Sequence, residues 1–125
     1  MKMAAREEMA ELVNSNSITC GFVYHGTACE EYWFQGTPEN IASFIGRFPD
    51  ADRMILTDTM DELVLDTIGW YIDTCPDKRL LEEVKKHLIP IQMGIAEPGE
   101  LFCPTMKEVN AYYDEKQWMD GMRFG

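Results

Sequence analysis

The chain has 125 residues, 46% of them hydrophobic and 11% aromatic, so it can form one domain with a sizeable core. Its 22 acidic residues against 11 Lys and Arg give a formal net charge of −11, which disfavours direct binding to nucleic acid or anionic lipid. Its apolar runs are far shorter than the ~20 residues of a membrane span, and Glu7, Glu8 and Glu11 interrupt any signal-like N-terminal stretch. We therefore expect a single cytoplasmic domain over residues 1–125.

The N-terminal part predicts a helix followed by a β-hairpin. Residues 1–14 are rich in helix-forming side chains and predict a helical arm. Residues 17–25 and 28–35 are rich in β-branched and aromatic side chains, which is typical of strands, and Gly26-Thr27 suits the turn between them.

The length of this turn decides which side chains face each other, and the sequence leaves two registers open. A two-residue loop pairs Tyr24 with Cys29 and Cys20 with Trp33. A three-residue loop pairs His25 with Cys29 instead.

The middle of the chain predicts a second helix and more strands. Thr37 is a good N-cap and Pro38 fits the first helical position, so a helix begins there; Pro49 ends it near Arg47. Residues 53–57 and 62–67 predict two strands of a hairpin. Residues 68–73 fit either a strand or one face of a helix, and their glycine and β-branched side chains favour the strand.

The C-terminal part predicts two helices separated by a loop. Residues 77–89 carry an apolar stripe at helical spacing, and Pro90 is expected to end that helix. Residues 91–104 contain glycines and prolines typical of a loop. Thr105 and Glu108 form a capping box for a last helix, expected to end near Trp118 and to leave residues 119–125 as a mobile tail.

The order of these elements is strand-strand-helix twice, followed by one more helix. This order predicts an α+β fold: an antiparallel sheet of about four strands, with helices packed on one face and a C-terminal helix added.

The hairpin carries a group of potential metal ligands, Cys20, His25 and Cys29. Strand alternation puts Cys20 and His25 on opposite faces, and the two-residue register separates Cys20 from Cys29 by about 13 Å, which disfavours a zinc site. A His25–Cys29 dyad requires the three-residue register and lacks a group that orients the imidazole.

The other candidate reactive groups also have structural explanations. Cys75 precedes a helix start, but Asp73 and Asp77 are expected to raise its thiol pKa. His87 suits a helix C-terminus, where a cation is favoured. The chain has no phosphate-binding glycine motif and no nucleophile-elbow motif. We therefore expect no catalytic residue, no metal ion and no cofactor.

Two features favour a contact surface for another protein. Tyr32, Trp33 and Phe34 are consecutive on a strand, so at least one large ring is left outside the core, where a partner, the N-terminal helix or residues 91–104 could cover it. Residues 50–77 contain eight acids and a single base, Arg53. The predicted interaction surface therefore comprises these residues: Tyr32, Trp33, Phe34, Asp58, Asp61, Glu62 and Asp66.

Residues 39–77, beginning ENIASFIGRFPDADRM, resemble a family of small uncharacterised proteins encoded on mobile elements of gut-dwelling anaerobic bacteria. The resemblance covers about a third of the chain and includes no catalytic motif. It implies a genetic context, and it implies no activity and no site residue.

The sequence thus predicts a non-catalytic, cytoplasmic accessory protein that binds another protein or a second copy of itself. One alternative is an acidic DNA mimic or anti-defence protein, which would need carboxylates arrayed like phosphates over one face. Another is a small enzyme or ligand-binding domain, which would need a deep pocket with converging polar groups.

Overall fold

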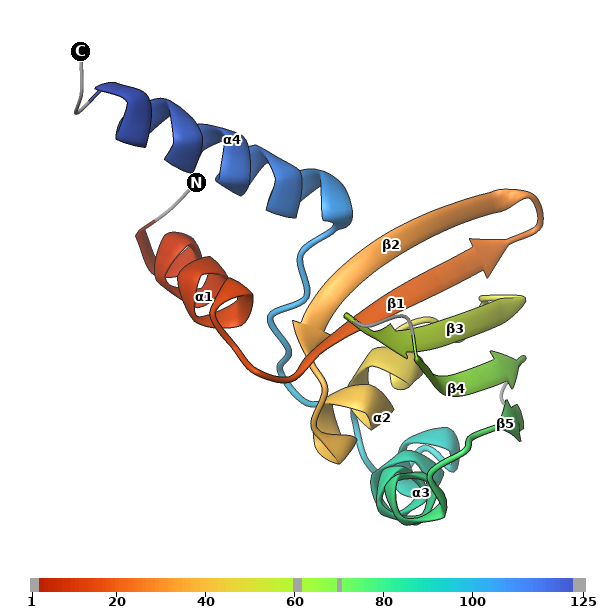
Figure 1. Ribbon diagram of the computed structural model, residues 1–125. Helices are drawn as coiled ribbons and strands as arrows, with labels where there is room; N and C mark the ends of the chain where they lie inside the picture. The colour runs from red at the N-terminus through yellow and green to blue at the C-terminus, as the bar shows by residue number, and fades with distance from the viewer. Residues whose placement is uncertain (1–2, 60–61, 70, 123–125) are drawn as a thin grey trace.

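The computed structural model describes residues 3–59, 62–69 and 71–122 and confirms the α+β fold. The strands form one sheet in the order β2-β1-β3-β4-β5, and every neighbouring pair is antiparallel (Figure 1). The elements are α1 (Met3–Val13), β1 (Ile18–His25), β2 (Ala28–Gln35), α2 (Pro38–Gly46), β3 (Arg53–Asp58), β4 (Leu63–Ile68), β5 (Tyr71–Thr74), α3 (Lys78–Gln92) and α4 (Met106–Met122).

The β1–β2 hairpin adopts the two-residue register. Tyr24 pairs with Cys29 and Cys20 pairs with Trp33, and Gly26 provides the positive φ of 60° that the turn requires. The sheet has five strands where the sequence indicated about four. The ambiguous stretch 68–73 is divided between two strands, because Gly69 also has a φ of 60° and begins the turn from β4 to β5.

Two predicted helix ends are wrong. Helix α3 does not stop at Pro90 but continues to Gln92. The missing N–H of Pro90 removes one hydrogen bond, yet Ile91 still packs against the core, and the Pro90 carbonyl accepts hydrogen bonds from the N–H groups of Ile95 and Ala96. Helix α4 extends to Met122, past the expected end near Trp118, because no proline interrupts it. Residues 123–125 of the predicted tail lie outside the described residues.

The core lies on the face of the sheet that α2 and α3 cover. Alternate side chains of the strands point to this face, and those at its centre are completely buried: Phe34, Met54, Leu56 and Leu65. Helix α2 adds Ile41, Phe44 and Ile45, and α3 adds Val84 and Leu88. The rings of Phe34 and Phe44 stack at 4.6 Å between centroids, which ties the edge strand β2 to the helix layer.

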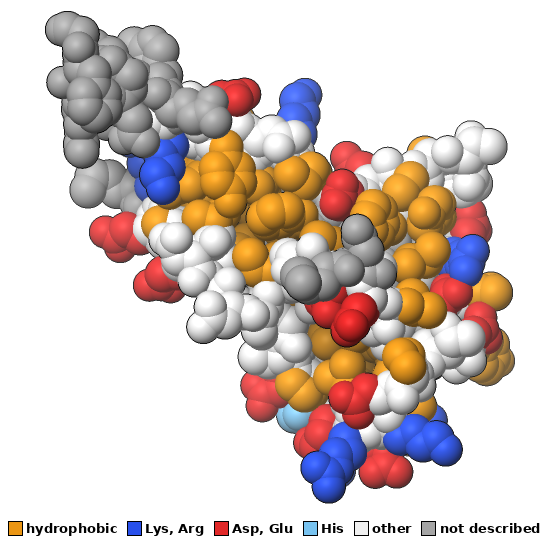
Figure 2. All heavy atoms as spheres, in the orientation of Figure 1, with side chains coloured by type: hydrophobic (Ala, Val, Ile, Leu, Met, Phe, Trp, Pro, Cys, Tyr) orange, Lys and Arg blue, Asp and Glu red, His pale blue; other side chains and the backbone are white. Residues whose placement is uncertain are grey.

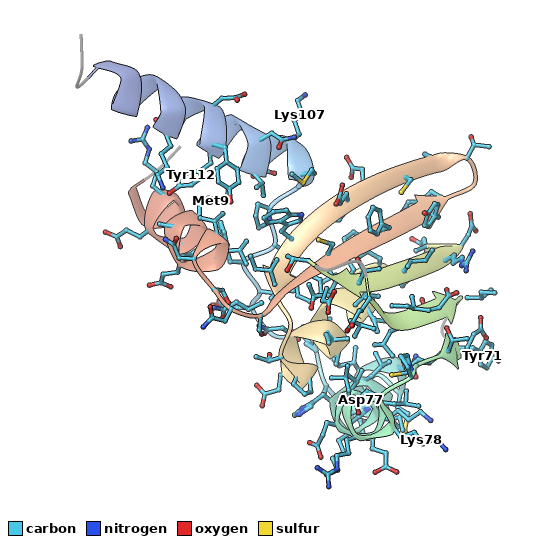
Figure 3. The ribbon with its side chains drawn as sticks, viewed as in Figure 1. Met9, Tyr71, Asp77, Lys78, Lys107 and Tyr112 are labelled. Carbon is cyan, nitrogen blue, oxygen red and sulfur yellow. The ribbon has the colours of Figure 1, made fainter. Side chains whose placement is uncertain are left out.

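Helices α1 and α4 lie together beside β2 and both contact it (Figure 1). Met9 of α1 lies toward Tyr112 of α4 (Figure 3), and Met9, Leu12 and Val109 are buried. An ion pair between Arg6 and Glu115 also links the two helices. The N-terminal helix is therefore packed against the fold through its apolar side.

The segment before α4 is attached to the outer edge of β2. The N–H of Trp33 donates to the carbonyl of Pro104 at 3.0 Å, and Tyr32 forms a bridge with Thr105. Thr105 then caps α4 by accepting from the N–H of Glu108 at 3.2 Å, as the capping box predicts.

Gly21 lets the helix layer approach the sheet closely. A Cβ at this position would lie 2.5 Å from Cζ and 2.6 Å from Cε1 of Phe44. Because Phe44 is fully buried and stacks on Phe34, its ring has little room to move away.

We therefore predict that Gly21→Ala lowers the free energy of unfolding by about 1–3 kcal/mol, the usual cost of overpacking a core. Urea unfolding followed by circular dichroism measures this loss. In a Phe44→Leu background the same change should cost less, because the smaller side chain removes the clash. Equal costs in both backgrounds would contradict the assigned contact.

Candidate functional site

The side of the sheet facing away from α2 and α3, called here the second face, carries the candidate site. The register places these side chains on it, at the centre and toward β5: Phe22, Tyr24, Arg53, Ile55, Asp66 and Ile68. Phe22, Tyr24 and Ile55 are half-buried, whereas Ile68 is 54% exposed. Hydrophobic side chains form a band from the α1–α4 region across the strands (Figure 2). The second face is thus apolar and incompletely covered.

The three aromatic residues predicted to form one surface lie on different faces of the sheet. Phe34 is completely buried, so its assignment to an interaction surface is wrong, and Tyr32 packs at 5.8 Å from Phe44 and 5.2 Å from Phe48 between ring centroids. Both belong to the core face because strand alternation gives them the same direction. Burial raises the pKa of Tyr32 to about 12, and its hydroxyl donates to Glu30 at 2.7 Å.

Trp33 points to the second face, beside Cys20 on β1. Its ring is half-buried, and its Nε1 atom is fully buried with no hydrogen-bond partner. Both α1 and α4 contact β2, the strand that carries it. The indole is therefore largely covered by the chain itself, and it marks the covered end of the second face.

The acidic residues predicted as part of the surface fall at two separate places. Asp58 and Glu62 close the β3–β4 connection: the Asp58 carboxylate accepts from the Glu62 N–H at 3.0 Å, and the Asp58 N–H donates to the Glu62 carbonyl at 3.1 Å. Asp61 lies outside the described residues. Asp66 lies on β4 in the middle of the second face. The structure therefore does not bring Asp66 together with Asp58 and Glu62.

Asp66 forms a two-point ion pair with Arg53 on the neighbouring strand. The Nε of Arg53 donates to Oδ1 at 2.9 Å and its Nη2 donates to Oδ2 at 2.5 Å. The hydrogen bonds to Asp66 raise the pKa of Arg53 further. Burial raises the pKa of the Tyr24 hydroxyl, and the neighbouring Cys29 raises it as well, so Tyr24 stays neutral. The centre of the second face thus carries a compensated charge pair between aromatic and aliphatic side chains.

No sequence pattern indicated the role of Asp52. Its carboxylate accepts from the N–H of Gly26 at 2.5 Å, and its carbonyl accepts from the N–H of Gly69 at 3.1 Å. One residue before β3 therefore holds both the β1–β2 turn and the β4–β5 turn, although these lie far apart in the sequence. This link fixes the end of the sheet where Ile68 and Tyr71 are exposed.

The cysteines and histidines form no reactive pair that the structure shows. Burial raises the pKa of Cys75, and it raises that of Cys103 to about 12, so both thiols stay protonated at neutral pH. The Nε2 of His87 lies 3.9 Å from the Glu39 carboxylate on the helix layer. Among the described residues no group of three His, Cys, Asp or Glu side chains is placed to bind one metal ion.

Comparison with protein-family models, with curated proteins and with solved structures gives no match for this chain. The resemblance of residues 39–77 to a mobile-element family therefore stays a prediction. Within the described ranges, no helix combines the length and the apolar composition needed to cross a membrane.

We predict that Asp52→Ala lowers the free energy of unfolding by about 1 kcal/mol, because the hydrogen bond to the first turn is lost. Asp50→Ala is the matched control: this exposed neighbour should change stability by less than about 0.5 kcal/mol. Urea unfolding of both variants measures the difference. Equal stability of the two variants would show that Asp52 does not hold the turn.

Proposed function

We propose that this chain is a non-catalytic, cytoplasmic protein-interaction protein, and that its second face receives the partner. The observation that supports this proposal is the exposure of apolar side chains toward β5, on the sheet face opposite α2 and α3. Ile68 is 54% exposed and Tyr71 is 79% exposed at the end of this face. Apolar side chains gathered on one surface commonly mark a contact with another protein.

The residue types on the second face fit this function. Trp33 lies at the end beside α1 and α4, so the proposed contact is the part of the face from β1 to β5. Phe22 and Tyr24 of β1 are half-buried on this part, and aromatic side chains are of the type that anchors such contacts.

The charges on the second face favour a protein over a phosphate-bearing ligand. Arg53 is held by Asp66, so the base on this part of the face is already neutralised. The chain has a net charge of −11, which keeps polyanions away. A neutral or basic protein surface does not need a free base on this face, and the negative net charge does not repel it.

The two alternatives receive less support. A nucleic-acid mimic needs a continuous array of free carboxylates, but several acids of residues 50–77 have local roles: Asp52 holds a turn, Asp66 pairs with Arg53, and Asp77 caps α3 by accepting from the N–H groups of Arg79 and Leu80. An enzyme needs converging reactive groups, and the two thiols with resolved pKa shifts, Cys75 and Cys103, are stabilised in the protonated form.

Affinity capture from the native host tests the proposed surface. We expect the wild-type chain to retain one stoichiometric partner, or a second copy of itself, and Ile68→Glu to lose it because a charge then lies in the contact. The matched control is Ile89→Glu on α3, which introduces the same charge at a residue of similar exposure, 48%, outside the second face.

Retention of the partner by Ile68→Glu would contradict the proposal, as would its loss from both variants. Recovery of a bound metabolite and no protein would favour the ligand-binding alternative. Mass spectrometry identifies the captured species, and light scattering of the purified chain shows whether it is a second copy.

A further inference from the structure

A cavity of about 280 Å³ lies at the end of the sheet where β1 and β4 begin and β2 and β3 end (Figure 1). A water molecule occupies about 30 Å³ in the liquid, so this space has room for about nine waters or for one small organic molecule. Polar residues of β1, of β3 and of the segments next to them line the cavity: Asn16, Ser17, Thr19, Asp58 and Thr59.

The hydroxyl of Thr19 points most directly to a ligand. Thr19 is only 5% exposed, and within the described part of the chain its hydroxyl makes no hydrogen bond. A buried hydroxyl nearly always has a partner in folded proteins, because water no longer reaches it. The strand register places Thr19 directly opposite Asp58, whose carboxylate accepts from the N–H of Glu62. The Thr19 hydroxyl therefore lacks a partner that the described chain supplies.

Gly36 leaves open the space that this hydroxyl occupies. A Cβ at position 36 would overlap Oγ1 of Thr19, so a larger residue would force the hydroxyl into another position. Gly36 and Thr19 both line the cavity. The hydroxyl is thus held at the cavity wall, where an atom of a bound molecule can reach it.

The chemistry of the lining favours a neutral molecule that carries hydroxyl groups. Ser17, Thr19 and Thr59 each provide a hydroxyl, which both donates and accepts hydrogen bonds, as a ligand hydroxyl does. The described lining contains no Lys, Arg or His, so an anion would find no opposite charge there. Val64 and Leu80 add an apolar side, against which the carbon atoms of a ring can pack.

We infer that this cavity binds a small neutral polyol, the chemical class that includes the monosaccharides. The Thr19 hydroxyl forms a hydrogen bond with a ligand hydroxyl, and the polar residues around it bind the others. The inference goes beyond the proposed function, because none of the residues that define the proposed protein contact lines the cavity in the described structure. Either site can therefore fail its test without affecting the other.

Titration of the isotopically labelled complete chain with D-ribose, D-glucose and myo-inositol, followed by two-dimensional NMR, tests the inference. We expect at least one of these polyols to shift the backbone signals of residues 16–19 and 58–59. A dissociation constant on the order of 1 mM suits a ligand of about ten to twelve non-hydrogen atoms. Inorganic phosphate should leave the same signals unchanged.

Three variants locate the binding. Thr19→Val keeps the shape of the side chain and removes the hydroxyl, so it should weaken polyol binding about fivefold or more without lowering the urea midpoint of the unbound chain. Asn16→Ala, at an exposed lining residue, should also weaken binding. Thr57→Val is the matched control, because it makes the same change at a half-buried residue beside Cys20 on the second face, and it should leave affinity unchanged.

No signal change with any of the three polyols would overturn the inference, as would an equal response to phosphate. Unchanged affinity in both Thr19→Val and Asn16→Ala would refute it, and so would an equal loss in Thr57→Val. A lower urea midpoint for Thr19→Val would show that the hydroxyl already has a partner within the chain, which would contradict the assignment of the cavity.

Discussion

The fully buried ring of Phe44 fixes which side of the sheet becomes the core. It lies against the backbone at Gly21, stacks on Phe34 and contacts the rings of Tyr32 and Phe48, so it joins α2 to both strands of the first hairpin. Side chains alternate between the two faces along a strand. When the side chains of one face are buried against Phe44, the side chains between them therefore lie on the second face. The exposed apolar side chains on that face follow from this packing.

The two faces of the sheet therefore have different roles. One is closed by α2 and α3. The other is partly covered near β2, beside α1 and α4, and open toward β5. Asp52 stabilises the open end by holding the turns at Gly26 and Gly69, and the Arg53–Asp66 pair neutralises charge at its centre. An apolar surface whose central charges are paired is well suited to bind a protein.

Local sequence signals predicted much of the fold, and contacts between distant segments account for what they missed. The Thr37-Pro38 start, the capping box at Thr105 and the turn at Gly26 each depend on neighbouring residues, and the structure confirms them. The passage of α3 through Pro90, the pairing of Asp66 with Arg53 and the role of Asp52 depend on tertiary packing. Consecutive aromatic residues at 32–34 suggested one surface, although alternation directs them to two faces.

Site-specific photocrosslinking in living host cells tests the central claim, that the second face receives a protein partner. A benzophenone side chain in place of Ile68 should give one discrete crosslinked adduct, because this position lies within the proposed contact. The same group in place of Ile89, two residues before Ile91 and therefore on the opposite side of α3, should give none. Absence of an adduct at position 68, or equal adducts at both positions, would contradict the account.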